Sequence, residues 1–122
     1  MNLRNNFHNI CNVTLTKLKN FIPYLQDKNI ALIKIDIEGS EGNALEGGID
    51  LIEKYHVPFI LMEFTPIYLK EHNTDPIKLL KLFIDNGYNI STKGFLSKEF
   101  VSIEYIIKHI NIQTNLYFIY MN

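Results

Sequence analysis

The residues that decide the fold run from Ile30 to Gly48 and read IALIKIDIEGSEGNALEGG. An apolar run rich in β-branched residues stops there at carboxylates and glycines, which predicts a buried strand, a turn and then a helix. Side chains of a strand over Ile30–Ile37 alternate between two faces. One face takes Ile33, Ile35 and Ile37, and the other takes Leu32, Lys34, Asp36 and Glu38. The charges therefore gather toward the carboxyl end of the strand, where polar function in open α/β sheets usually lies.

Helical and strand patterns alternate along the rest of the chain. Helices are expected over Lys17–Gln26, from the cap Ser40 to the break at Gly47–Gly48, and over Ile49–Tyr55, Ile77–Asn86 and Glu99–Ile110. Further strands are expected over Val57–Phe64, Tyr88–Thr92 and Asn115–Met121. The first strand is almost continuously hydrophobic, which suits a parallel strand covered on both faces, and the second strand is again apolar almost throughout. The sequence thus predicts one α/β domain with a mostly parallel sheet.

Composition narrows the class of partner. The formal net charge is −1, from 12 Lys and Arg against 13 Asp and Glu. Such a balance gives no large single-sign field, so we expect neither nucleic acid nor a membrane as partner. Cys11 is the only cysteine, and no apolar run has the length of a signal peptide core or a transmembrane helix. A soluble, cytoplasmic protein is the expectation.

Three segments carry a resemblance to a known family. IKIDIEGSE, NALEGG and LMEFTP, which begin at Ile33, Asn43 and Leu61, resemble the central signature of the FkbM family of S-adenosylmethionine-dependent methyltransferases. The resemblance runs from about Val13 to about Tyr120. It implies a Rossmann-like methyltransferase fold whose last strand is antiparallel between its neighbours, and O-methylation of a small molecule or a sugar hydroxyl. We therefore divide the chain into a polar leader, residues 1–12, and a partial FkbM-like domain, residues 13–122.

The resemblance covers only the later, C-terminal portion of the family's domain. That domain begins with a strand and a glycine-rich loop that holds S-adenosylmethionine, and this chain has no Gly-x-Gly segment before Ile30. Thr16 also stands where many members carry an acid. The family implies S-adenosylmethionine as cofactor, but we expect its binding half to be missing here, and the sequence names no cofactor-binding residue.

Asp36, Glu38 and Glu63 are the candidate catalytic residues. Glu63 ends the second strong strand, and if the two strands are neighbours it lies beside Asp36. A carboxylate at this place can orient a substrate hydroxyl, act as a general base or bind a cation. The alternative is that Asp36 caps a turn or helix and that the glutamates are only solvated.

Lys34, Gly39 and Glu41 are the candidate substrate-binding residues. Lys34 shares a strand face with Asp36, so it can pair with the carboxylate, or its side chain can reach water from a sheet edge. Gly39 allows close backbone approach, which also serves plain turn geometry. No metal site is predicted, because the His8-x-x-Cys11 spacing lacks the second pair that structural zinc needs.

Two hypotheses of function follow. The first is a methyltransferase acting on a small-molecule substrate, present as a truncated domain that is inactive as the isolated chain. The second is a noncatalytic α/β remnant or interaction module. A receiver-like or other nucleotide-binding α/β domain comes third, because many folds share an acidic strand end. Missing strands would leave an exposed sheet edge, which favours self-association.

Overall fold

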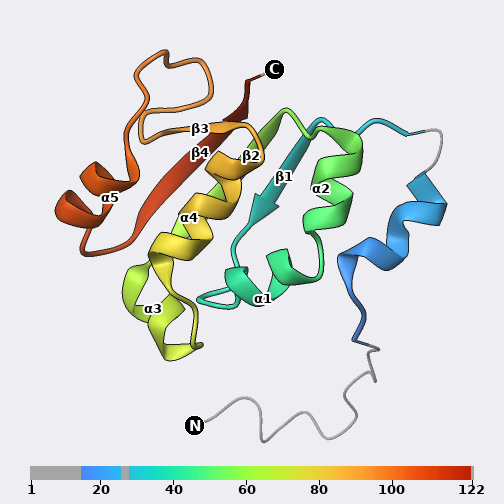
Figure 1. Cartoon of the computed structure of the whole chain (residues 1–122), viewed down its shortest axis with the longest axis horizontal. Helices are drawn as coiled ribbons and strands as arrows, with labels where there is room; N and C mark the ends of the chain where they lie inside the picture. Colours follow the sequence, from blue (N-terminus) through green and yellow to red (C-terminus); the bar gives the residue numbers. More distant parts are fainter. Residues whose placement is uncertain (1–14, 26–27, 122) are drawn as a thin grey trace, which may run out of the picture.

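The computed structural model describes residues 15–25 and 28–121, which form one sheet with helices packed against it (Figure 1). The leader predicted for residues 1–12, with His8 and Cys11, lies outside the described residues. The strands are β1 (Leu32–Ile35), β2 (Phe59–Phe64), β3 (Tyr88–Ser91) and β4 (Thr114–Tyr120). The helices are η2 (Leu18–Leu25), α1 (Glu41–Glu46), α2 (Ile49–Tyr55), α3 (Pro66–Glu71), α4 (Pro76–Asp85) and α5 (Ile103–His109).

The four strands are ordered β1-β2-β4-β3. β1 pairs with β2 in parallel, whereas β4 runs antiparallel to both β2 and β3. The sheet is therefore mixed, and the prediction of a mostly parallel sheet was wrong. The cause is the place of the last strand, since one antiparallel strand inserted between two others makes both of its pairings antiparallel. That insertion itself was implied by the family resemblance and is confirmed.

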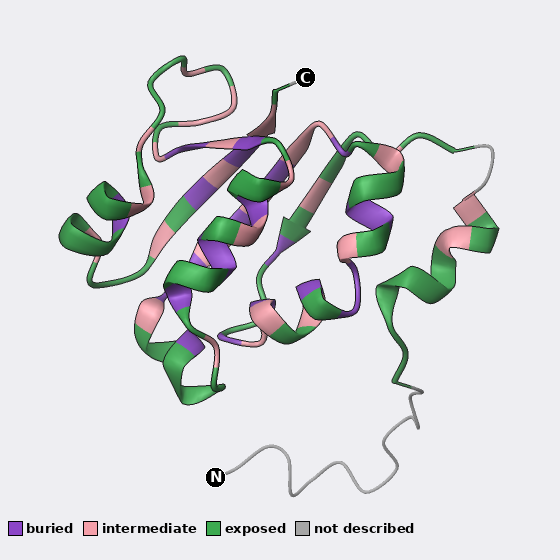
Figure 2. Ribbon diagram, viewed as in Figure 1, coloured by how far each residue is buried: buried purple, intermediate pink, exposed green. Residues whose placement is uncertain are grey.

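The helices cover one face of the sheet. α1, α2 and α4 lie on the same side of the strands (Figure 1), and β2 alternates strictly between half-buried and buried residues (Figure 2). The face away from these helices, which we call the outer face, includes Leu32, Lys34, Phe59 and Leu61. Leu32 is 50% exposed there. The prediction that the first strand is covered on both faces was wrong for the described residues, because apolar content does not show which face a helix covers.

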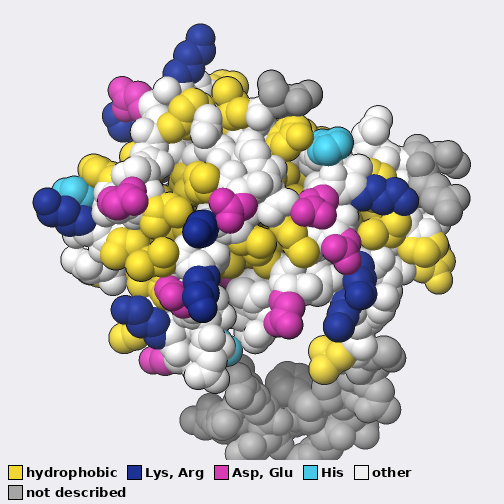
Figure 3. Space-filling view, in the orientation of Figure 1, with side chains coloured by type: hydrophobic (Ala, Val, Ile, Leu, Met, Phe, Trp, Pro, Cys, Tyr) yellow, Lys and Arg dark blue, Asp and Glu magenta, His cyan; other side chains and the backbone are white. Residues whose placement is uncertain are grey.

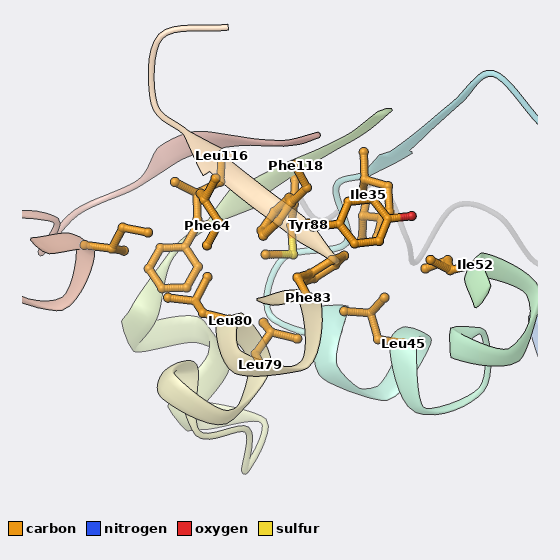
Figure 4. Close-up of a cluster of buried hydrophobic side chains, with 14 of the residues drawn as sticks. Ile35, Leu45, Ile52, Phe64, Leu79, Leu80, Phe83, Tyr88, Leu116 and Phe118 are labelled. Carbon is orange, nitrogen blue, oxygen red and sulfur yellow. The ribbon is translucent and has the colours of Figure 1, made fainter. Parts of the chain in front are cut away.

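The core lies between the sheet and the helices (Figure 4). Its centre is the pair Phe83 of α4 and Phe118 of β4, whose rings stack with centroids 3.9 Å apart. Fully buried side chains from β2 and from α1 and α2, such as Met62, Leu45 and Ile52, extend the same cluster. Burying side chains of this size stabilises a fold by about 1.5–3 kcal/mol each. This packing fixes the strands whose carboxyl ends form the site.

Local signals explain where several elements begin and end. The Asp75 side chain accepts a hydrogen bond from the amide of Ile77 at 2.9 Å, so α4 begins at the predicted cap. Gly87 ends that helix with φ +91°. The first helix is confirmed in position but is a 3₁₀ helix, with Pro23 inside it. Because proline lacks an amide hydrogen, it cannot complete a regular α-helical ladder.

Two helices differ from the prediction. α3 was not predicted at all, although Thr65 and Pro66 supply a cap position and a first-turn proline. α5 begins at Ile103 rather than Glu99, because the Ser102 side chain accepts a hydrogen bond from the Tyr105 amide and sets the start.

Within the described part of the chain, no helix is long and apolar enough to cross a bilayer.

Candidate functional site: an acidic rim at the carboxyl ends of two strands

The carboxyl ends of β1 and β2 bring acidic side chains together. Lys34 is opposite Leu61 in the parallel register, so Asp36 and Glu63 each come two residues later along adjacent strands. The two carboxyl groups lie close enough for hydrogen bonding with Asp36 to raise the pKa of Glu63. The prediction that these two residues meet at one edge of the sheet is confirmed. We call Asp36, Glu38, Glu41 and Glu63 the acidic rim.

The electrostatics of the acidic rim act most clearly on Glu63. Its hydrogen bond with Asp36 raises the pKa of the Glu63 carboxyl above its ordinary value. Partial loss of solvent raises this pKa further, as do the negative charges of Asp36, Glu41 and Glu38. The Glu63 carboxyl therefore holds its proton to a higher pH than an isolated glutamate does.

Glu41 holds the turn that follows β1. It is only 2% exposed, and its carboxylate accepts a hydrogen bond from the Gly39 amide at 2.7 Å. A negative charge in the first turn of α1 is also favourable to the helix dipole. Ser40 occupies the predicted cap position but makes no side-chain cap hydrogen bond. The structure thus places Glu41 as a buried support of the turn, with its charge still close enough to Glu63 to raise that residue's pKa.

The same turn requires glycine at position 39. Gly39 has φ +101°, and a Cβ atom there would lie 2.6 Å from the Tyr68 carbonyl oxygen and 2.7 Å from His72 Nδ1. The neighbouring Glu38 also has a positive φ, of 49°, and its side chain is exposed. The close approach that Gly39 permits is therefore taken by α3 and the residue after it. This contact supports the interpretation of Gly39 as a turn residue rather than as a place where the backbone approaches a ligand.

Lys34 lies on the outer face of the sheet, in the same row as Leu32. Its side chain is exposed, and no ion pair joins it to Asp36 among residues 15–25 and 28–121. This agrees with the alternative in which the ammonium group reaches water from a sheet edge.

Sequence reasoning missed the part played by α3. Tyr68 and His72 form one wall of the turn, and the His72 ring is fixed by a 2.9 Å hydrogen bond between Nδ1 and the Tyr68 carbonyl oxygen. The signal that could have found this helix was the Thr65-Pro66 pair directly after β2.

In the described residues no group of three or more His, Cys, Asp and Glu side chains is placed to hold a metal ion.

The architecture and the acidic rim define a class, that of α/β proteins with a polar edge at the carboxyl ends of adjacent parallel strands. Within that class, the family model described as the methyltransferase FkbM domain matches residues 2–90. The chain therefore belongs to the FkbM methyltransferase domain family. The match includes β1, α1, β2 and most of β3, so the whole acidic rim lies inside it. No curated protein and no solved structure matches the chain.

FkbM methyltransferases generally use S-adenosylmethionine, so we tested whether the described residues fit that cofactor. A nucleotide cofactor on this kind of sheet needs a glycine-rich turn that leaves its backbone open to the ligand. The turn after β1 does not provide one, because the space beside Gly39 is filled by Tyr68 and His72. Gly42 in α1 is likewise closed, since a Cβ atom there would lie 2.4 Å from Thr74 Oγ1. Neither Gly39 nor Gly42 therefore leaves its backbone open to S-adenosylmethionine.

Proposed function

We propose that this chain is the acceptor-binding part of an S-adenosylmethionine-dependent methyltransferase that acts on a hydroxyl group of a small molecule or a sugar. The observation that carries the proposal is the juxtaposition of the Asp36 and Glu63 carboxyl groups at the ends of adjacent parallel strands of an FkbM domain. The cofactor half of the domain is, in this proposal, supplied by a longer form of the chain or by a partner.

The carboxyl pair suits an acceptor hydroxyl. Methylation of a hydroxyl oxygen requires that its proton leave while the oxygen points at the donor methyl group. Asp36 is exposed beside the half-buried Glu63, so an incoming hydroxyl can reach the Asp36 carboxylate and donate to it. Asp36 then orients the acceptor and takes the proton. Glu38 and Lys34 stand on either side of Asp36 in sequence, where they can bind neighbouring hydroxyls.

Two observations test this proposal. In the coding DNA upstream of Met1 we expect an in-frame strand followed by a glycine-rich turn. A longer chain or complex that includes that segment should bind S-adenosylmethionine, whereas the chain of residues 1–122 alone should not bind it tightly. Tight binding by this chain alone would contradict the proposed division of the site.

Variants of the cofactor-binding form test the carboxyl pair. Asp36→Asn should lower methyl transfer by about 10²–10⁴-fold, the range for loss of a positioned general base, and leave cofactor affinity unchanged. Glu104→Gln is the matched control, since it removes an exposed carboxylate from α5. Full transfer activity in Asp36→Asn would refute the role given to this residue.

A noncatalytic α/β interaction module is the second candidate. The filled space beside Gly39 favours it, because the turn that leads from β1 to α1 packs on protein rather than opening to a ligand. In that case Asp36 and Glu63 only close the end of the sheet. Transfer of a labelled methyl group from S-adenosylmethionine by the isolated chain would eliminate this candidate.

We also propose that the chain associates with itself through β1. Within the described residues β1 pairs only with β2, and an unpaired strand edge is a template for another strand. Sedimentation velocity should show a mass that rises with protein concentration. Leu32→Lys should weaken the association, because a second charge beside Lys34 opposes edge pairing. A monomer at every concentration would exclude it.

A further inference from the structure

β1 is the edge strand of the sheet, and its side away from β2 is open. Within residues 15–25 and 28–121, β1 pairs only with β2, and no other backbone hydrogen bond involves its residues. An unpaired strand edge can take up another strand, as in the association through β1 proposed above. The side chains along this edge decide which strand it accepts and in which register.

Opposite charges lie next to each other on the outer face of this edge. Lys34 and Asp36 are two residues apart, so their side chains leave the strand on the same face, about 7 Å from each other along the chain. Both side chains are exposed, and neither forms an ion pair within the part of the chain that the structure describes. Ile35, between them, points into the core and is 7% exposed. Each copy of the chain therefore offers one cation and one anion at this edge.

The helix-covered side of the molecule has a different charge pattern. Acidic and basic side chains are interspersed over its helices (Figure 3). Charge therefore singles out no one place on that side for a second copy, whereas the edge of β1 presents its two charges in a fixed order along one strand.

Symmetry limits how two copies of β1 can pair. A twofold axis between two antiparallel edge strands is perpendicular to the sheet, so it keeps both outer faces on the same side. An axis at Ile33 places Lys34 opposite Leu32 of the other copy, and an axis at Lys34 places the two ammonium groups opposite each other. An axis at Ile35 places Lys34 of each copy opposite Asp36 of the other. Among axes at residues of β1, only this one brings Lys34 opposite a carboxylate.

We propose that two copies of the chain pair antiparallel through β1 about a twofold axis at Ile35, with Lys34 of each copy forming an ion pair with Asp36 of the other. This inference rests on the self-association proposed above and gives it a register. Cross-strand pairs of opposite charge stabilise a sheet, whereas like charges directly opposite destabilise it. Lys34 of the second copy thereby joins the acidic rim, where it supplies a cation beside Asp36.

Charge variants of the full chain test the ion pairs by sedimentation velocity. Lys34→Glu places like charges opposite each other at both sites and should weaken the dimer by about tenfold. The double variant Lys34→Glu with Asp36→Lys restores opposite charges in the same register and should recover most of the affinity. Lys108→Glu, the matched control at an exposed position of α5, should have no effect.

Two results would overturn the inference in different ways. An unchanged dimer in Lys34→Glu would refute the ion pairs but leave self-association through β1 intact. A wild-type chain that stays monomeric at every concentration would refute the self-association together with its register. Neither result bears on methyl transfer by a cofactor-binding form of the protein.

Disulfide cross-linking tests the register directly. Cys11 is the only cysteine, so the variants are made in a Cys11→Ser background. A mixture of Lys34→Cys and Asp36→Cys chains should cross-link on mild oxidation, because the two thiols lie opposite each other and the second Lys34–Asp36 ion pair is retained. Lys34→Cys that cross-links mainly with itself would place the axis at Lys34. Preferential cross-linking to Leu32→Cys would place it at Ile33, and either result would overturn the proposed register.

Discussion

Replacing Gly39 by alanine should destabilise the protein strongly, and the structure gives the size of the effect. At φ +101° an alanine is strained by about 1–3 kcal/mol. Its Cβ atom would also lie 2.6 Å from the Tyr68 carbonyl oxygen, and relieving such an overlap with backbone costs about 1–3 kcal/mol more. The expected loss of unfolding free energy is therefore about 2–6 kcal/mol.

Gly94→Ala is the matched control for this substitution. Gly94 has φ +137°, but nothing lies within 4 Å of the Cβ atom that alanine would add there. Gly94→Ala should therefore show the backbone strain alone, about 1–3 kcal/mol. Urea unfolding followed by far-ultraviolet circular dichroism measures both variants. Equal losses in Gly39→Ala and Gly94→Ala would refute the close contact between the turn and α3.

Three further predictions concern a helix cap and two pKa shifts. Asp75→Ala should cost about 1 kcal/mol in urea unfolding, whereas Ser40→Ala should change little, because the Asp75 side chain makes a cap hydrogen bond and the Ser40 side chain does not. Burial raises the pKa of Tyr88 to about 12. The stability that Tyr88 contributes is therefore complete below its ordinary pKa of 10.0 and is lost as the pH rises toward 12. In Tyr88→Phe the free energy of unfolding should decrease less between pH 10 and 12, by up to about 3 kcal/mol. An equal decrease in wild type and variant would contradict the burial of this hydroxyl. The pKa of Glu63 is raised mainly by hydrogen bonding with Asp36. The stability that Glu63 contributes is therefore complete below its ordinary pKa of 4.5 and is lost as the pH rises through its pKa in the folded protein. Glu63→Gln should therefore gain stability relative to wild type between acidic and neutral pH, and urea midpoints that keep a constant difference across this range would disprove the shift.

The site could be located from the sequence because it depends on local pattern. An apolar strand that stops at Asp36, and a second that stops beside Glu63, place two carboxylates at one edge as soon as the strands pair in parallel. The glycine break after α1 and the Asp75-Pro76 helix start are also local signals. Each of these predictions rested on residues within a few positions of one another.

The remaining features depend on contacts between distant segments. The sequence of β1 reads as fully buried, but the helices lie on one side of it, so Leu32 faces outward. Ile37 fits the period of the strand, yet it is 43% exposed because the strand ends at Ile35 and the turn begins. Tyr68 packs against Gly39, so the segment after β2 contacts the turn after β1. No periodicity in the sequence predicts this contact.

The position of β4 has a consequence for how the protein is made. This strand comes last among the described elements, yet it fills the gap between β2 and β3 and supplies Phe118 to the centre of the core. Until the ribosome has added β4, β2 and β3 have no strand between them, and their apolar faces stay incompletely buried. The sheet therefore completes its folding only after synthesis has reached Tyr120.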